Sequence, residues 1–344
     1  MIARRWQQGR VALLLLLSAC SGSTPTGTPA SGSTSGSGGT SSGGGTPAPV
    51  VYVPGQSYFG RKNYIEYVAG NAPVILSAPH GGALIPSSIP DRTAAKCGGS
   101  ATTVTDVNTI ELVRAMQQRY FVRFGVYPHV IISHLSRKKL DPNRMALEAA
   151  CNVAEAQDAL DDWHAFITQA KADVAKAFGN GWYMDMHGHA HPIARLELGY
   201  LLADADLDKT DAALDASPTY LQTSSIRALV PKSGLRFSQL LRGPLSLGTL
   251  LTSAGFPAVP SQSDPAPNGT DYFNGGDNTE RHTCGSAASA LGGITDGPIC
   301  GVQIESNYTG VRDTQVNRER FGDAIAQVLE TYLGTHWGLK LRKP

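Results

Sequence analysis

The chain of 344 residues carries 29 basic and 28 acidic residues, so its formal net charge at pH 7 is +1. No basic patch stands out, which argues against nucleic acid as a partner. The remainder after a low-complexity N-terminus, about 295 residues, is long enough to form a single α/β domain with a sizeable core.

The first 49 residues have the composition of a targeting segment followed by a spacer. Three arginines precede a short apolar run at residues 11–17, which is too short to span a bilayer. The run ends in Leu17-Ser-Ala-Cys20, which resembles the lipobox of bacterial lipoproteins and implies cleavage before Cys20 and a lipid on its sulfur. The alternative is an ordinary secretory signal with an incidental cysteine.

Residues 21–48 contain only Ser, Gly, Thr, Pro and Ala, and such a segment has nothing to bury. We therefore expect a signal peptide at residues 1–19, a lipidated cysteine with a disordered linker at 20–49, and one folded domain at 50–344. The expected location is outside the cytoplasm, anchored by lipid to the bacterial cell envelope, at the outer membrane or the periplasmic face.

Four further cysteines remain, an even number in a chain expected to be exported, where disulfides persist. Three connectivities are possible. We favour Cys284–Cys300, which closes a Gly-rich loop, together with Cys97–Cys151. A zinc site made of cysteines is disfavoured because no Cys-x-x-Cys spacing occurs.

Short apolar runs alternate with helical patterns along the domain. Residues 74–78 and 129–134 read as buried strands, and residues 152–178 have the apolar spacing of a helix. Further strands are expected at residues 198–202 and 302–306, and a last helix at 316–333. Strands separated by helices predict an α/β fold, a three-layer sandwich around a mostly parallel or mixed sheet.

The stretch from Trp182 to His191 runs from apolar and aromatic residues into a carboxylate and three imidazoles. Alternation with period two places Asp185, His187 and His189 on one face if the strand continues that far. Neutral imidazole is the commonest ligand of transition metals, and a nearby carboxylate can fix the tautomer of a ligating ring. This stretch by itself is equally consistent with a His-rich surface turn.

Four short signatures follow in order along the chain, each at a predicted strand end: Pro79-His-Gly-Gly82, Asp141-Pro-Asn-Arg144, Asp185-Met-His187 and Gln303-Ile-Glu305. Together, over roughly residues 59–333, they resemble the N-formylglutamate amidohydrolase family, which looks like a branch of the zinc carboxypeptidase and aspartoacylase group. The resemblance implies a zinc-exopeptidase-like (phosphorylase/hydrolase-like) fold with one Zn²⁺ at the strand ends.

The resemblance also implies roles for single residues. His80 and His187 match the two histidine ligands, Glu305 matches the catalytic glutamate, and Asn143 with Arg144 matches a pair that grips a substrate carboxylate. We expect Arg137 or Arg144 to help stabilise the oxyanion, and assign the carboxylate to Arg144.

The third ligand departs from the pattern of the carboxypeptidases, whose ligating glutamate falls three residues after the first histidine. Ala83 occupies that position here. Asp106 is our choice, because the pattern Asp106-x-x-Thr109 resembles the segment that follows the histidine motif in formylglutamate hydrolases; otherwise Asp106 is a helix N-cap. Asp185 is the second candidate, although we expect it to orient His187, and we place His189 near the ligands without ligating.

These residues predict a zinc-dependent hydrolase that cleaves an amide bond of an N-acyl amino acid or peptide bearing a free carboxylate. The alternatives are an esterase or a polyglutamate-type polymer hydrolase at the same site, or a binding lipoprotein without catalysis.

The predicted lipid anchor has a direct test. The Cys20→Ala variant removes the sulfur that would carry the lipid, so we expect it to leave the membrane fraction. The measurement is partitioning of wild type and variant between membrane and soluble fractions. Unchanged partitioning of the variant would reject the anchor.

Overall fold

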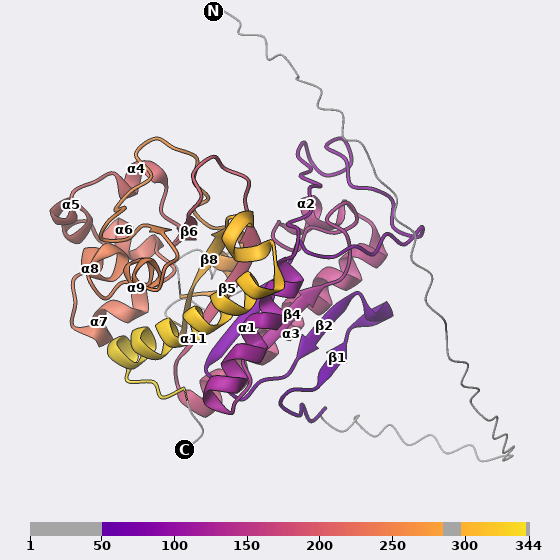
Figure 1. Cartoon of the computed structure of the whole chain (residues 1–344). Helices are drawn as coiled ribbons and strands as arrows, with labels where there is room; N and C mark the ends of the chain where they lie inside the picture. The colour runs from indigo at the N-terminus through magenta and orange to yellow at the C-terminus, as the bar shows by residue number, and fades with distance from the viewer. Residues whose placement is uncertain (1–49, 285–296, 342–344) are drawn as a thin grey trace, which may run out of the picture. The chain divides into compact units, whose positions relative to one another are not determined.

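A mixed sheet of eight strands runs through the structure in the order β1-β2-β4-β3-β5-β8-β6-β7 (Figure 1). Its strands are β1 (Ser57–Phe59), β2 (Ile65–Val68), β3 (Val74–Ala78), β4 (His129–Ser133), β5 (Gly181–Gly188), β6 (Leu196–Gly199), β7 (Ala258–Val259) and β8 (Ile299–Ser306). The central neighbours β4, β3, β5 and β8 are mutually parallel, whereas β1, β2 and β6 join them through antiparallel pairs.

The four parallel strands are buried along nearly their whole length, which explains their almost continuous apolar sequences. Alternate side chains still divide between two apolar layers. Leu76 and Met184 face one layer, whereas Ile75 and Tyr183 face the other. Chemical groups at the strand ends therefore also belong to one face or the other.

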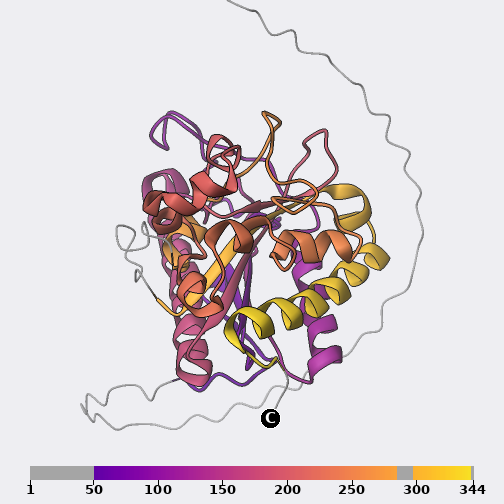
Figure 2. The ribbon, with the colours of Figure 1, turned by 90° about the vertical axis from the view of Figure 1, so that its left-hand side faces the viewer.

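Helices cover both faces of the sheet, as the turned view in Figure 2 shows. On one face, α1 (Thr109–Phe124) packs along α11 (Gln315–Trp337). On the other face, α3 (Ala154–Phe178) packs over β2, β3, β4 and β5. The predicted α/β class and the three-layer arrangement with a mixed sheet are confirmed.

Shorter helices lie between β6 and β8 in the chain. They are α4 (Asp204–Leu207), α5 (Asp211–Ala216), α6 (Pro218–Thr223), α7 (Val230–Ser233), α8 (Phe237–Arg242), α9 (Leu247–Ser253) and α10 (Asp277–His282), with a further short helix, α2 (Ala146–Ala150), before α3. Single turns occur at Arg61–Asn63, Arg227–Leu229 and Tyr308–Arg312. The stretch 260–284, although rich in glycine and proline, thus contains a helix, α10.

The computed structural model describes residues 50–284 and 297–341. The predicted signal peptide, Cys20 and the linker lie outside these residues. The chain divides into a unit Met1–Val50 and a compact unit Val51–Pro344. Disulfides join Cys97 to Cys151 and Cys284 to Cys300, the pairing favoured from the sequence. No helix within the two described ranges is long and apolar enough to cross a membrane.

Candidate metal centre

The centre is built where parallel strands end, on the sheet face covered by α3. Along β5, Tyr183, Asp185 and His187 point to this face by alternation. β8 pairs in parallel with β5 so that His187 lies beside Glu305 and Asp185 beside Gln303. The strand register therefore places the signature Asp185-Met-His187 beside the signature Gln303-Ile-Glu305. The carboxyl ends of such strands are where open α/β sheets bind ligands.

His80 reaches the same place from the turn after β3. The chain passes very close to β4 there, and a side chain at Gly82 would collide with the backbone carbonyl carbon of His134 at 2.4 Å. Glycine therefore lets the turn lie against the sheet and hold His80 inward. His80 is 1% exposed.

Asp106 comes from the segment between His80 and α1. Its backbone carbonyl, not its carboxylate, accepts hydrogen bonds from the amide and hydroxyl of Thr109, where α1 begins. The carboxylate is thus not used as a helix cap. It lies instead against the two histidines and accepts a hydrogen bond from the backbone N–H of Gly188 at 3.3 Å.

Three donor atoms form a nearly equilateral triangle. The Nδ1 atoms of His80 and His187 are 3.1 Å apart, and each lies 3.2 Å from Oδ2 of Asp106. All three side chains are buried, and they form a group able to hold a metal ion. Asp106, one of the two carboxylates considered from the sequence, is thus the one that faces both rings.

Each imidazole is also contacted by one further carboxylate, on the ring nitrogen that faces away from the triangle. Oδ1 of Asp141 lies 2.6 Å from Nε2 of His80, and Oδ2 of Asp185 lies 2.8 Å from Nε2 of His187. Each carboxylate accepts the Nε2 proton, which leaves the Nδ1 lone pair free to ligate. Two nitrogen lone pairs that face each other at 3.1 Å repel unless a proton or a metal ion lies between them.

The donor set suits zinc. Ligand bonds of about 2.0–2.2 Å at tetrahedral angles place donor atoms about 3.3–3.6 Å apart, close to the separations in this triangle. Two imidazole nitrogens and one carboxylate oxygen leave one tetrahedral position open, as in catalytic zinc sites. All three residues line a cavity of about 190 Å³, whose wall also includes Glu305, Asn143 and Arg144.

The local electrostatics favour positive charge at the triangle. Burial lowers the pKa of His187, but the charge of Asp185 and hydrogen bonds to Asp106 and Asp185 raise it well above the usual value. Burial raises the pKa of Asp106, but the two neighbouring histidines hold it well below its usual range. Carboxylates that stabilise a proton on the His187 ring would also stabilise a metal cation in its place.

Glu305 lies beside the triangle without belonging to it. Its Oε1 is 3.9 Å from Nδ1 of His187 and accepts a hydrogen bond from the amide of Gln303 at 3.0 Å. Burial raises the pKa of Glu305 to about 8, although the nearby His187 opposes the shift. A carboxyl group with such a pKa can take up and release a proton near neutral pH.

The two arginines singled out from the sequence lie in different surroundings. Arg137 donates from Nε to Asp141 at 2.9 Å and lies 3.6 Å from Asp106, so its guanidinium is committed to buried carboxylates. Arg144 donates to the backbone carbonyl of Asn143, and its carboxylate contact is Glu148 at 3.8 Å. Of the two, Arg144 has the guanidinium that is freer to bind a ligand.

His189 does not continue the face of β5. The strand ends at Gly188, and the His189 ring donates from Nε2 to the carbonyl of Arg195 while its Nδ1 accepts the N–H of His191. Among the described residues, its hydrogen bonds do not include His80, Asp106 or His187. Backbone groups thus hold the His189 ring, and its expected place near the ligands stays a prediction.

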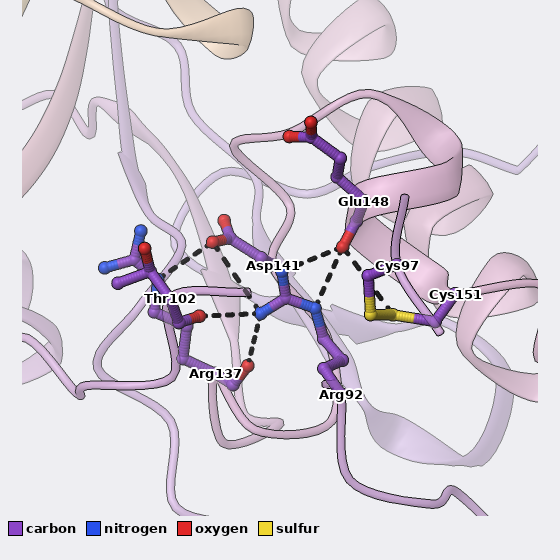
Figure 3. The surroundings of a disulfide bond; sticks show 7 residues. All are labelled: Arg92, Cys97, Thr102, Arg137, Asp141, Glu148 and Cys151. Atoms are coloured by element: carbon purple, nitrogen blue, oxygen red, sulfur yellow. Dashed lines mark hydrogen bonds and ion pairs between the residues drawn. A yellow bond between two sulfur atoms is a disulfide. The ribbon is translucent and has the colours of Figure 1, made fainter. Parts of the chain in front are cut away.

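Arg92, which we did not predict, ties the wall of the cavity to α2, as Figure 3 shows. Its Nη1 donates to the carbonyls of Thr102 and Arg137, and its Nε and Nη2 donate to a carbonyl of α2. The disulfide between Cys97 and Cys151 joins the same segment to the end of α2. A single buried guanidinium and one disulfide thus hold the loop that carries Thr102 to the site.

Several other contacts were missed from the sequence. Asn278 on α10 donates to Asp185 at 3.1 Å, and Ser77 on β3 donates to the same carboxylate at 2.5 Å. Asp141 stood within a recognised signature, but we had assigned it no role. Its position after the apolar run 129–134 was the available signal.

Comparison with known proteins leaves the family open. No protein-family model and no curated protein matches the sequence. An N-formylglutamate amidohydrolase from Ralstonia eutropha JMP134 is similar in structure, with 13% identity and a TM-score of 0.43 over 78% of this chain and 95% of that one. A protein from Agrobacterium tumefaciens has 12% identity and a TM-score of 0.42 over 79% of this chain and 95% of the other.

A succinylglutamate desuccinylase from Chromobacterium violaceum is more distant, with 11% identity and a TM-score of 0.31 over 81% of this chain and 70% of that one. At this level of likeness, function has to be argued from the residues of the site.

The hydrogen bond from His80 to Asp141 predicts a loss of metal affinity when the carboxylate is neutralised. We expect Asp141→Asn to weaken zinc binding about 10–100-fold, because a partner of this kind fixes the ring and raises its basicity. The measurement is zinc affinity by competition with a chelator. Asp91→Asn removes an exposed carboxylate paired with Lys139 and serves as the control. Equal affinities in the two variants would contradict the role of Asp141.

Proposed function

We propose that this chain is a zinc-dependent hydrolase that cleaves the amide bond of an N-acyl amino acid or peptide bearing a free carboxylate, in the manner of an N-formylglutamate amidohydrolase. The carrying observation is the triangle of His80, His187 and Asp106 beside Glu305 at the wall of one cavity. Such a hydrolysis needs a set of metal ligands, a proton acceptor and a group that binds the substrate carboxylate. Glu305 is the proton acceptor, and Arg144 is the group for the carboxylate.

A zinc ion bound at the triangle would supply an activated water and polarise the scissile carbonyl. Glu305 acts as the general base: it takes the proton of the attacking water and passes it to the leaving nitrogen. The amide of Gln303 donates to Oε1 of Glu305 and so orients the carboxyl group. Because β8 is buried from Ile299 to Ser306, the base is held on a rigid element.

Arg144 binds the free carboxylate of the substrate, with Asn143 positioning the turn. The guanidinium lies at the cavity wall, where its side chain is 35% exposed, and it is not committed to a buried acid. Asn143 is buried and hydrogen-bonds to Gln303 and to the backbone N–H of Asn278. A planar guanidinium suits a two-point grip on a carboxylate. The substrate would thus be held at one end while its amide lies at the zinc.

Turnover should depend on Glu305 while zinc binding does not. We expect Glu305→Gln to keep the fold and full zinc but to lose turnover by about 10²-fold or more, the usual scale for a positioned acid–base group. The measurement is kcat on N-acyl amino acids, with zinc content determined on the same samples. Glu111→Gln changes an exposed residue of α1 and is the control. A fully zinc-loaded Glu305→Gln protein with wild-type kcat would remove Glu305 from the mechanism.

Substrate selection should depend on Arg144. We expect Arg144→Ala to raise KM about 10–100-fold for substrates with a free carboxylate, because a charge-assisted hydrogen bond contributes about 1.5–3 kcal/mol. Substrates whose carboxylate is replaced by an amide should change far less. The control is Arg119→Ala, which removes a partly exposed arginine paired with Asp323. An equal effect on charged and neutral substrates would place the carboxylate elsewhere.

A further inference from the structure

A much larger groove adjoins the cavity at the metal centre. The cavity has a volume of about 190 Å³ and the groove about 700 Å³. Their walls share five residues, namely Thr102, Asp106, Arg137, Gly188 and Phe273. Asp106 is one of the three metal-facing residues, so a ligand at the centre can extend directly into the groove.

The groove and the carboxylate grip are formed by different residues. Asn143, Arg144 and Gln303 line the small cavity but not the groove. Val104, Val107 and Tyr308 line the groove but not the small cavity. A substrate whose carboxylate lies at Arg144 and whose amide lies at the centre would therefore place its acyl group in the groove.

Exposed apolar side chains gather in this groove. Val104 is 73% exposed, Val107 50%, and Phe273 and Tyr308 44% each. Single exposed apolar residues are common, but a group of them beside a reactive centre marks a binding surface. The Phe273 ring is held by stacking on His191, with ring centres 4.7 Å apart. The wall is thus apolar and partly preorganised.

Two of the ionisable side chains of the groove are already hydrogen-bonded by the protein. Arg312 donates to the carbonyls of Ser306, Val107 and His189. Both ring nitrogens of His189 are used by backbone groups. The groove therefore offers apolar surface without an uncommitted charge of its own, and this favours an apolar ligand over an anionic one.

We propose that the groove binds an aromatic or long aliphatic acyl group, so that the preferred substrates are amino acids carrying a bulky apolar N-acyl group. This inference rests on the proposed function. In the reaction, water adds to the acyl carbon and the C–N bond breaks, which yields the free carboxylic acid and the amino acid. A formyl group, with one carbon, would leave the groove empty.

The test uses the zinc-loaded protein and a series of glutamates carrying formyl, acetyl, benzoyl or octanoyl groups. We expect kcat/KM to rise at least about tenfold from formyl to benzoyl and octanoyl, because burial of apolar surface contributes about 25 cal/mol per Å². Tyr308→Ala should reduce this preference severalfold. Phe59→Ala, which truncates an aromatic side chain 50% exposed on β1, should leave the preference unchanged. A formyl substrate that is preferred, or equal preference in wild type and Tyr308→Ala, would overturn the inference.

A binding measurement separates this inference from the proposed function. Calorimetric titration of the same acyl-glutamates into the Glu305→Gln protein reports affinity without turnover. Tighter binding of benzoyl- than formyl-glutamate, lost in the double variant with Tyr308→Ala, supports the groove even if wild type hydrolyses none of the series and the proposed function fails. Equal affinity across the series rejects the groove even if hydrolysis is observed.

Discussion

The site depends on two buried hydrogen bonds, from His80 to Asp141 and from His187 to Asp185. Each fixes its ring so that Nε2 carries the proton and Nδ1 points inward, toward the other ring and Asp106. If either carboxylate were absent, the ring could rotate or present the wrong tautomer. The positions of the three donor atoms therefore depend on Asp141 and Asp185 as much as on the two histidines.

Sheet topology brings these groups together over long sequence separations. β5 lies between β3 and β8 in the sheet. The carboxyl ends of these three strands therefore lie side by side, and they carry His80, His187 and Glu305. The parallel register pairs His187 with Glu305, which places the proposed general base on the strand beside that of His187. Arg92 then ties the outer loop to α2, with the Cys97–Cys151 disulfide beside it (Figure 3). The geometry of the site therefore depends on strand order more than on any local motif.

Part of this could be predicted from the sequence because it is local. The apolar run Val74–Ala78, bounded by prolines, defines β3, and alternation along β5 places Asp185 and His187 on one face. The contact of His80 with Asp141 spans 61 residues and has no local pattern. Asn278 and Phe273 lie in a stretch rich in glycine and proline, where periodicity carries no signal. The end of β5 at Gly188 could not be predicted either, because a strand end cannot be located to one residue from alternation.

Four carboxyl groups lie buried close together, and their surroundings separate them into two kinds. Asp106 and Asp141 lie near Arg137, and Asp185 accepts hydrogen bonds from Ser77 and Asn278 as well as His187. These three have pKa values lowered below the usual range, because their neighbours outweigh the cost of burial. Glu305 has only the amide of Gln303 as a hydrogen-bond donor among the described residues, and burial raises its pKa. Surroundings that separate the pKa values of neighbouring carboxyl groups also separate their roles. Asp106, Asp141 and Asp185 are suited to stay charged, whereas Glu305 is suited to transfer a proton.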